Sequence, residues 1–417
     1  LSIPKLYSGK DRTFIFGGFE GTKVRQYSYA TTTVPTALMR NGNFSEAPAL
    51  IYDPNTTTAN PGNPGRYLRA PFAGNIIPAN RMNTVNLNYN QFYPLPNAPG
   101  IVNNYNWVNS IGTDDAQGTV RVDHNFNATS RLFGRWSITD NSYRNGDWEN
   151  GISAWSQFVK ANTFVLNYTK ILSPTLVMDL RYGFALQRNQ MVPTSMGTDA
   201  SALGFSQQFK GQQIIPVIPT LSISGIRGIG YDSSRNWSRY SHAVAANFSW
   251  VHGGHTVKFG WDGRLMRNNE LSLDAGGGRF SYDPSFANGP NPQAAVPAGQ
   301  STFGAYATFL LGLPRSGNIA YNDSLARQQY YHGFFIQDDW KVTPRLTLNM
   351  GLRYEIETGF TERFNRQANF DPYLTNPLAT TGLPLQGGVS FSGINGNPRN
   401  LWKTDVNHFS PRFGFAY

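Results

Sequence analysis

Residues 335–355 decide the fold; they read FIQDDWKVTPRLTLNMGLRYE. Apolar side chains recur at every second position in the last part of this stretch, at Leu348, Met350 and Leu352, with polar residues or glycine between them. Successive side chains of a β-strand point to opposite faces of its sheet, so such a strand has one apolar and one polar face. The pattern breaks at residues 342–345, VTPR, which favour a turn. The stretch therefore predicts an antiparallel hairpin with one apolar side.

Other segments alternate in the same way, and tight turns join several of them. The alternating segments are residues 120–126, 163–169, 176–187, 244–250 and 256–265, and the further turn sequences are residues 127–130, 172–175 and 252–255. Alternating segments of about ten residues, separated by turn residues, are typical of β-barrels that cross an outer membrane. The sequence therefore predicts an all-β, antiparallel transmembrane β-barrel.

The connections alternate between short and long. The long ones are rich in Pro, Asn and Gly and cover residues 33–113, 190–236, 272–323 and 361–408. Loops of this length are uncommon in compact soluble domains. Outer-membrane barrels have short periplasmic turns and long extracellular loops, so we expect the turns at one end of the sheet and the loops at the other. A soluble β-sandwich is the alternative, but it does not normally carry all its long loops at one end.

The composition agrees with a barrel. Charged residues make up 14% of the 417 residues, and aromatic residues another 14%; a soluble domain usually has about 25% charged residues. The longest strongly apolar stretch, residues 307–313, is far shorter than the roughly 20 residues of a spanning helix. The absence of cysteine excludes a disulfide scaffold, a thiolate metal site and a cysteine nucleophile.

The formal net charge of +10 is spread singly along the chain. A nucleic-acid-binding protein normally clusters its basic residues on one face or one helix, so we expect no nucleic-acid partner. Contact between basic residues and anionic lipid headgroups explains the charge better.

The polar positions of the alternating segments are the candidate functional residues. An Arg or Lys facing lipid at mid-bilayer costs about 2–4 kcal/mol, whereas lumen positions are wet or paired. We therefore expect the polar sets to face the lumen of the barrel. The lumen-facing candidates are Arg121, Asp179, Arg181, Lys258, Asp262, Arg264, Asn349 and Arg353.

Several stretches resemble TonB-dependent outer-membrane receptors of the Oar-like kind, and they follow one another along the chain in the order found in those receptors. Residues 335–355 resemble a barrel hairpin common in TonB-dependent receptors, and residues 10–21, KDRTFIFGGFEG, resemble the segment that leaves the plug and begins the barrel. The loop-like stretches are residues 34–45, 75–81 and 93–97, and residues 409–417 resemble a further strand.

The resemblance implies an N-terminal domain, a plug that carries a TonB-contacting box, and a 22-stranded barrel in the outer membrane. This chain shows about a dozen plausible strands and no plug of useful size. We therefore expect a partial barrel with free edges. Residues 1–12 would be the end of the plug or a linker, and residues 13–417 the partial barrel. The implied partners are outer-membrane lipid, an unidentified substrate, and the TonB complex through a plug not present in this chain.

No catalytic, metal-binding or cofactor-binding pattern stands out. His252 and His255 flank a Gly-Gly turn, which is more simply a polar turn than a metal site. The glycine-rich residues 225–230 lack the strand–helix context of a phosphate-binding loop. Asp338 and Asp339 point to opposite faces if they lie on a strand, so they cannot act as a catalytic pair. An enzyme is therefore the least favoured class.

Residues 302–313 form a short apolar segment. We interpret it as a loop helix that packs internally on the barrel rim, and a partner-binding helix is the alternative.

Three functions remain open. Energised uptake of a substrate across the outer membrane is favoured, with the barrel as conduit and the loops as the capture surface. A non-transporting surface or adhesion protein is the second, and a passive porin is the third.

Overall fold

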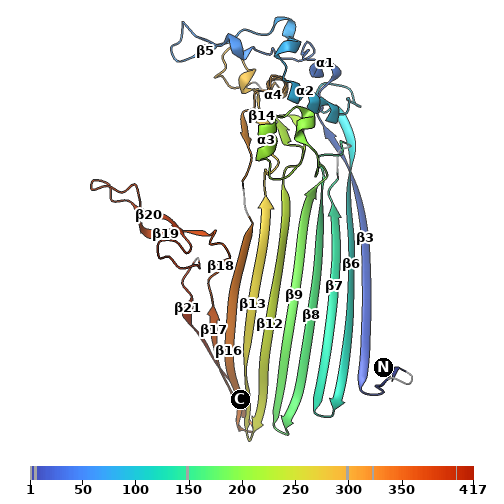
Figure 1. The fold of residues 1–417 in the computed structure, drawn as a ribbon, viewed down its shortest axis with the longest axis vertical. Coiled ribbons are helices and arrows are strands. Elements are labelled where there is room, and N and C mark those ends of the chain that lie inside the picture. The colour runs from blue at the N-terminus through green and yellow to red at the C-terminus, as the bar shows by residue number, and fades with distance from the viewer. Residues whose placement is uncertain (1, 4–6, 147–149, 297–299, 322–323, 401) are drawn as a thin grey trace.

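The computed structural model describes residues 2–3, 7–146, 150–296, 300–321, 324–400 and 402–417. Its main feature is an 11-stranded sheet, whose long strands pair antiparallel with their neighbours (Figure 1). In order across the sheet these are β21 (Asp405–Ala416), β17 (Leu346–Glu357), β16 (Leu325–Thr343), β13 (His255–Leu273), β12 (Ser234–His252), β9 (Leu176–Pro193), β8 (Trp155–Ser173), β7 (Ser130–Arg144), β6 (Tyr105–Asn127) and β3 (Thr13–Thr32). The short β18 (Thr361–Glu362) pairs with β16.

The four predicted turns lie together at one end of the sheet and the first three long connections at the other, whereas the fourth long connection follows a shorter strand and lies beside the sheet about halfway along it (Figure 1). The turn-flanking pairs are Asn127 with Ser130, Ser173 with Leu176, His252 with His255 and Thr343 with Leu346. For the turns and the first three long connections, this is the arrangement that the alternation of short and long connections predicted. All alternating segments found in the sequence lie within these strands.

The strands run further toward the loop end than the sequence predicted. Residues 105–113 belong to β6, residues 190–193 to β9, residues 234–236 to β12, residues 272–273 to β13 and residues 405–408 to β21. The predicted loops were too long there because the outer strand ends lack a regular apolar face, although their backbones still pair. The connection at residues 145–154 was not predicted. Residues 1, 4–6, 297–299, 322–323 and 401, which belong to the predicted linker, third loop and fourth loop, lie outside the described residues.

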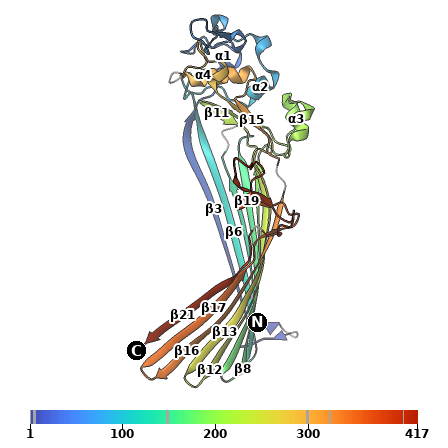
Figure 2. The same cartoon turned by 90° about the vertical axis from the view of Figure 1, so that its left-hand side faces the viewer.

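The sheet does not close on itself. Strands β3 and β21 form its two edges, and no pairing between them is present in the described part of the chain. Figure 2 shows that the sheet is strongly twisted, so that β21, β17 and β16 swing away from β3 toward the turn end. An open, antiparallel sheet with free edges is what a partial barrel predicts.

The first three long connections fold into a compact cap, which we define as residues 33–104, 194–233, 274–296 and 300–321. Its helices are α1 (Ala37–Arg40), α2 (Thr84–Tyr89), α3 (Gln207–Gln212) and α4 (Ser301–Leu310), with short 3-10 turns η1 (Pro54–Thr56), η2 (Ala73–Asn75), η3 (Ala79–Arg81), η4 (Asn90–Phe92), η5 (Ala200–Leu203) and η6 (Pro284–Phe286). Its small sheet contains β11 (Ile226–Ile229), β10 (Thr220–Ile223), β14 (Arg279–Tyr282) and β15 (Ser316–Asn318). Within the described residues, no helix has both the length and the apolar character that crossing a membrane requires.

The remaining strands form three small hairpins outside the main sheet. They are β1 (Ser2–Ile3) with β2 (Tyr7–Ser8), β4 (Thr58–Ala59) with β5 (Tyr67–Leu68), and β19 (Ala368–Thr375) with β20 (Gln386–Phe391).

The cap has a hydrophobic core centred on α4. Phe303, Tyr306, Phe309 and Leu310 are at most 1% exposed and belong to one buried cluster with side chains from the other two connections. Aromatic edges meet there: the rings of Tyr282 and Phe309 are perpendicular, with centroids 5.3 Å apart. The apolar segment at residues 302–313 therefore packs internally, as interpreted from the sequence, but its partners are the other cap segments.

We expect Leu310→Ala to destabilise the cap, because deleting a buried leucine side chain usually costs about 2–5 kcal/mol. Leu50→Ala, at a cap position that is 55% exposed, is the matched control. Limited proteolysis of the intact protein in detergent should show faster cleavage within the cap only for Leu310→Ala. Equal resistance of the two variants would contradict a cap with its own core.

An ion pair fixes the first cap connection. Arg81 donates from Nη1 and Nη2 to the two carboxylate oxygens of Asp53 over 2.9 and 2.8 Å. Hydrogen bonding from Arg81 holds the pKa of Asp53 below its ordinary value. A carboxyl with a lowered folded-state pKa contributes stability above its unfolded pKa of about 3.9, and this contribution is lost as the pH falls through the folded pKa.

The cap of the wild-type protein should therefore become more sensitive to pepsin as the pH is lowered from 5 to 2. Asp53→Asn removes the titrating carboxylate, so its cap should already be sensitive at pH 5 and change less. Asp11→Asn, outside the cap, should behave as the wild type does. An unchanged pH profile in Asp53→Asn would show that this ion pair does not stabilise the cap.

Candidate functional site

The main sheet has one apolar face, defined by side chains that lie opposite one another on neighbouring strands. Its members include Leu180, Tyr182, Val244, Phe248, Phe259, Trp261, Phe334, Ile336, Leu348, Met350 and Leu352. Many of them are exposed; Ile336, for example, is 53% exposed. On β9 the apolar positions run from Leu176 to Leu186, which is about 33 Å along a strand. The usual tilt of barrel strands reduces this to the height of about 25 Å that is typical of a membrane-facing apolar band.

Charged residues bound this apolar band on its cap side. Lys23 lies opposite Asp114, Asp140 lies opposite Lys160, and Lys160 lies opposite Arg188. The Lys160 ammonium is 3.2 Å from the Asp140 carboxylate. Charges end the band where a membrane-facing surface would reach the lipid headgroups.

The opposite side of the sheet is its polar face, and all eight candidate residues lie on it. The register places Arg121, Asp179, Arg181, Lys258, Asp262, Arg264, Asn349 and Arg353 on this one face. They do not form a single site. Six of them belong to three separate hydrogen-bonded clusters.

The first cluster lies on β6 and β7. Arg121 Nε and Arg131 Nη2 both donate to the Asp123 carboxylate over 2.6 Å, and the Arg121 guanidinium lies 3.9 Å from the centre of the Phe133 ring. The carboxylate neutralises one of the two guanidinium charges, so this part of the polar face stays basic.

The second cluster joins β8 and β9 through an amide. Asn167 Nδ2 donates to Asp179 over 2.8 Å, and Asn167 Oδ1 accepts from Arg181 Nε over 3.2 Å. Asp179 also accepts from the hydroxyl of Thr169 over 2.9 Å. The Asn167 amide therefore bridges the two candidates.

The third cluster is centred on Tyr331. Arg353 Nη2 donates to the Tyr331 hydroxyl over 2.7 Å, and the Arg264 guanidinium lies 5.0 Å from the centre of its ring. Asp262 accepts hydrogen bonds from Arg264, and Glu355 accepts from Arg353 over 3.0 Å. The side chains of Lys258 and Asn349 make no hydrogen bond within the described residues.

The other motifs from the sequence have structural roles. The His255 imidazole lies 2.6 Å from Asp338 on the apolar face near a tight turn, whereas Asp339 lies opposite Asn349 on the polar face. Asp338 and Asp339 thus point to opposite faces, as predicted. Gly225 lies in the turn between β10 and β11, where an added Cβ would meet Thr302 of α4, so its glycine serves close packing. Within the described residues, no group of three or more metal-binding side chains was found.

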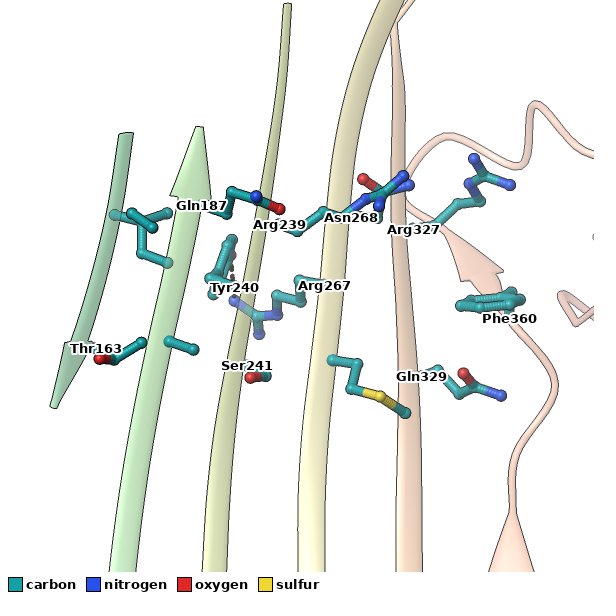
Figure 3. Close-up of a pocket in the computed structure, with 14 residues that line it drawn as sticks. Thr163, Gln187, Arg239, Tyr240, Ser241, Arg267, Asn268, Arg327, Gln329 and Phe360 are labelled. Carbon is teal, nitrogen blue, oxygen red and sulfur yellow. Dashed lines mark hydrogen bonds between the residues drawn. The ribbon is translucent and has the colours of Figure 1, made fainter. Parts of the chain in front are cut away.

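A groove on the polar face is the best candidate for a ligand site (Figure 3). Its volume is about 520 Å³, within the usual range for small-molecule pockets. It is built from two rows of residues that lie opposite one another on β8, β9, β12, β13 and β16. The row nearer the cap is Ala161, Gln187, Arg239, Asn268 and Arg327, and the second row is Thr163, Ala185, Ser241, Met266 and Gln329.

The groove is hollow because many side chains on its floor are small. Alanine, serine and threonine form much of the floor, whereas Gln187, Arg239, Asn268 and Arg327 form a polar row across it (Figure 3). Neighbouring strands lie about 4.8 Å apart, so the row presents a polar group at each such step.

Phe360 closes one side of the groove, and the chain around it is firmly held. Gln329 donates to the Glu357 carboxylate over 2.8 Å and to the Thr358 carbonyl over 2.9 Å. The fully buried carboxylate of Glu362 accepts three backbone N–H groups, from residues 326, 364 and 366. Burial raises the pKa of Glu362, but these three hydrogen bonds outweigh it and hold the pKa below its ordinary value.

The groove residues were not singled out from the sequence, although most carry a usable signal. Asn268 lies four residues beyond the candidate Arg264 on the same face, and Gln187 lies six beyond Arg181. Gln187 ends the alternating segment 176–187, and extending the segment 256–265 by three residues would have found Asn268. Phe360 follows a strand end and has no comparable signal.

This chain belongs to the outer membrane beta barrel domain family, whose model matches residues 3–417. The protein is therefore located in the outer membrane, which implies contact with lipid. No curated protein sequence matches the chain.

Solved structures similar to this chain include outer-membrane receptors and transporters. The copper transporter OprC is 11% identical with a TM-score of 0.36, over 69% of this chain and 37% of its own. FpvA of P. aeruginosa, bound to heterologous pyoverdines, is 9% identical with a TM-score of 0.39, over 75% and 36%. The ferric-catecholate import receptor Fiu of E. coli K12 is 13% identical with a TM-score of 0.26, over 63% and 45%. The chain thus spans just over a third of the length of the first two.

The two faces can be tested with spin labels on single-cysteine variants of the intact protein in bilayers. Labels at positions 348, 350 and 352 should be relaxed by oxygen, which concentrates in lipid. Labels at positions 349 and 353 should be relaxed by a polar reagent. Burial of all three of the first set against protein would favour a soluble sandwich over a membrane-facing surface.

Proposed function

We propose that this chain is part of a TonB-dependent receptor of the Oar-like kind. Such a receptor takes up a substrate across the outer membrane, driven by energy supplied from the inner membrane. The polar face would line the lumen of a 22-stranded barrel, and the apolar face would contact lipid. Residues 1–12 would lead from the plug into the barrel at residue 13. The TonB complex would act through that plug, which is not present in this chain.

The groove on the polar face is the observation that carries this proposal. A protein that only anchors a recognition surface needs ligand-binding groups on its outer loops. It needs none on the inner wall of its barrel. A groove with arginine, amide and aromatic side chains on that wall lies on the path that a passing solute would take.

The free edges of the sheet support a barrel larger than the strands present here. Unpaired backbone groups are not tolerated in lipid, and closure of a barrel removes them. Both β3 and β21 have one unpaired side, so further strands between them would satisfy the constraint. A large barrel would also leave a lumen wide enough to need a plug.

A non-transporting surface or adhesion protein is the second candidate, and the folded cap favours it. A connected hydrophobic core makes the cap a rigid surface suited to recognition. A passive porin is the third candidate.

Uptake can be tested in cells that carry the intact gene or a deletion, by following the loss of solutes from a defined growth medium by mass spectrometry. Energised transport predicts that at least one solute is depleted only when the gene is present, and that a protonophore stops its depletion. Continued depletion with the protonophore would favour the porin. No gene-dependent depletion would favour the adhesion protein.

Phe360→Ala should slow the gene-dependent uptake, because it removes one wall of the groove. Phe364→Ala is the matched control, since Phe364 is close in the sequence but 57% exposed and does not line the groove. Equal uptake by the two variants would show that the groove is not on the transport path.

A further inference from the structure

The charge of the groove indicates the kind of ligand it would hold. Its lining includes Arg239, Arg267 and Arg327 and no acidic side chain. Arg327 is compensated by Glu270, 3.1 Å away. Arg267 lies in the row of Leu186, which belongs to the apolar face, and its guanidinium donates to the Tyr240 hydroxyl and to Gln328 over 3.0 and 2.9 Å. An arginine with no counter-charge is a ready partner for a carboxylate, which it can hold through two parallel hydrogen bonds.

Arg239 is that arginine. It is exposed, it has no ion pair in the described part of the chain, and its guanidinium is 4.3 Å from the centre of the Trp237 ring. It stands between Gln187 and Asn268 in the polar row (Figure 3). The stacking on Trp237 holds the side chain in place without using its hydrogen-bond donors.

The neighbours of Arg239 suit the hydroxyl groups of a sugar. Gln187 and Asn268 offer amide groups, and Ser241 offers a hydroxyl. Asn268 Oδ1 and Arg327 Nε are buried without a hydrogen-bond partner. Buried polar groups are normally paired, so a ligand would pair these two atoms only after their side chains turn toward the groove.

Phe360 gives the groove a flat apolar wall, against which the C–H face of a pyranose ring can pack. The Arg327 guanidinium lies 6.0 Å from the centre of this ring, so the aromatic wall and the polar row adjoin. The steps of about 4.8 Å along the row are close to the length of one sugar unit.

A peptide ligand fits less well. Extended peptides usually bind by adding a strand to a sheet edge, where main-chain groups are free. Strands β8, β9, β12, β13 and β16 are interior strands, and both neighbours already pair with each of them. The groove therefore offers side chains and no free main-chain edge.

We infer that the groove binds a short acidic oligosaccharide, with a uronic-acid carboxylate on Arg239, hydroxyl groups along Gln187, Asn268 and Ser241, and one sugar ring against Phe360. The inference rests on the proposed function in that it takes the polar face to be the inner wall of the barrel. It names the class of substrate that this wall would capture.

Calorimetric titration of the intact protein in detergent with trigalacturonate tests this inference, and maltotriose is the neutral probe of equal length. Trigalacturonate should bind at least tenfold more tightly than maltotriose, because a charge-assisted hydrogen-bond pair is lost with the neutral sugar. Its affinity should fall as salt is added. Absent binding, or equal binding of both sugars, would overturn the inference. Binding of a glutamate tripeptide in place of trigalacturonate would also overturn it and assign the groove to peptides.

Two variants locate the binding. Arg239→Gln should weaken trigalacturonate binding about tenfold or more and leave the weak maltotriose binding unchanged. Arg345→Gln removes the same charge at a tight turn on the far end and should bind as the wild type does. Unchanged affinity in Arg239→Gln would overturn the site. These titrations need no TonB complex, so binding without energised uptake would contradict the proposed function alone, and energised uptake without binding would contradict the substrate class alone.

Discussion

Backbone hydrogen bonding across the sheet is the constraint on which the rest of the structure depends. Within hydrocarbon no water can satisfy an unpaired N–H or C=O, so each strand must pair along its full span. The register that this pairing sets also fixes which side chains share a face, because a slip of one residue exchanges the faces. Such a slip on β9 would carry Arg181 onto the face that now holds Leu180 and Tyr182. One apolar and one polar face therefore follow from the pairing.

The two parts of the molecule bury apolar surface in different ways. Nearly all fully buried apolar side chains belong to the cap, whose connections meet around α4. The sheet leaves large apolar side chains exposed on one face, such as Ile336 and Trp136, each 53% exposed. The cap can thus fold by the ordinary hydrophobic effect in water, whereas the sheet needs lipid to cover its apolar face.

This division explains what the sequence could and could not predict. The strands, the four tight turns and the two sets of alternating residues follow from local periodicity, which reports which face a side chain takes. Residues 105–113 were placed in a loop because Val108 and Asn109 interrupt the alternation, although Tyr105 and Trp107 are buried against the cap core. The cap core joins residues such as Met39, Ile229 and Phe309, which are far apart in the sequence. A local sequence pattern does not predict contacts between residues so far apart in the chain. The long connections were therefore expected only as loops.

The groove shows how the register turns separate sequence positions into one site. Gln187, Arg239, Asn268 and Arg327 come from four strands, yet the pairing sets them side by side. This row lies level with Leu186, the last residue of the regular apolar alternation on β9, so it stands at the cap-side limit of the apolar band. Under the proposed function, a ligand binds to this row before it crosses the part of the barrel that the apolar band surrounds. The polar clusters around Tyr331 and Asn167 then lie along the remaining path, and the step that requires energy comes after capture.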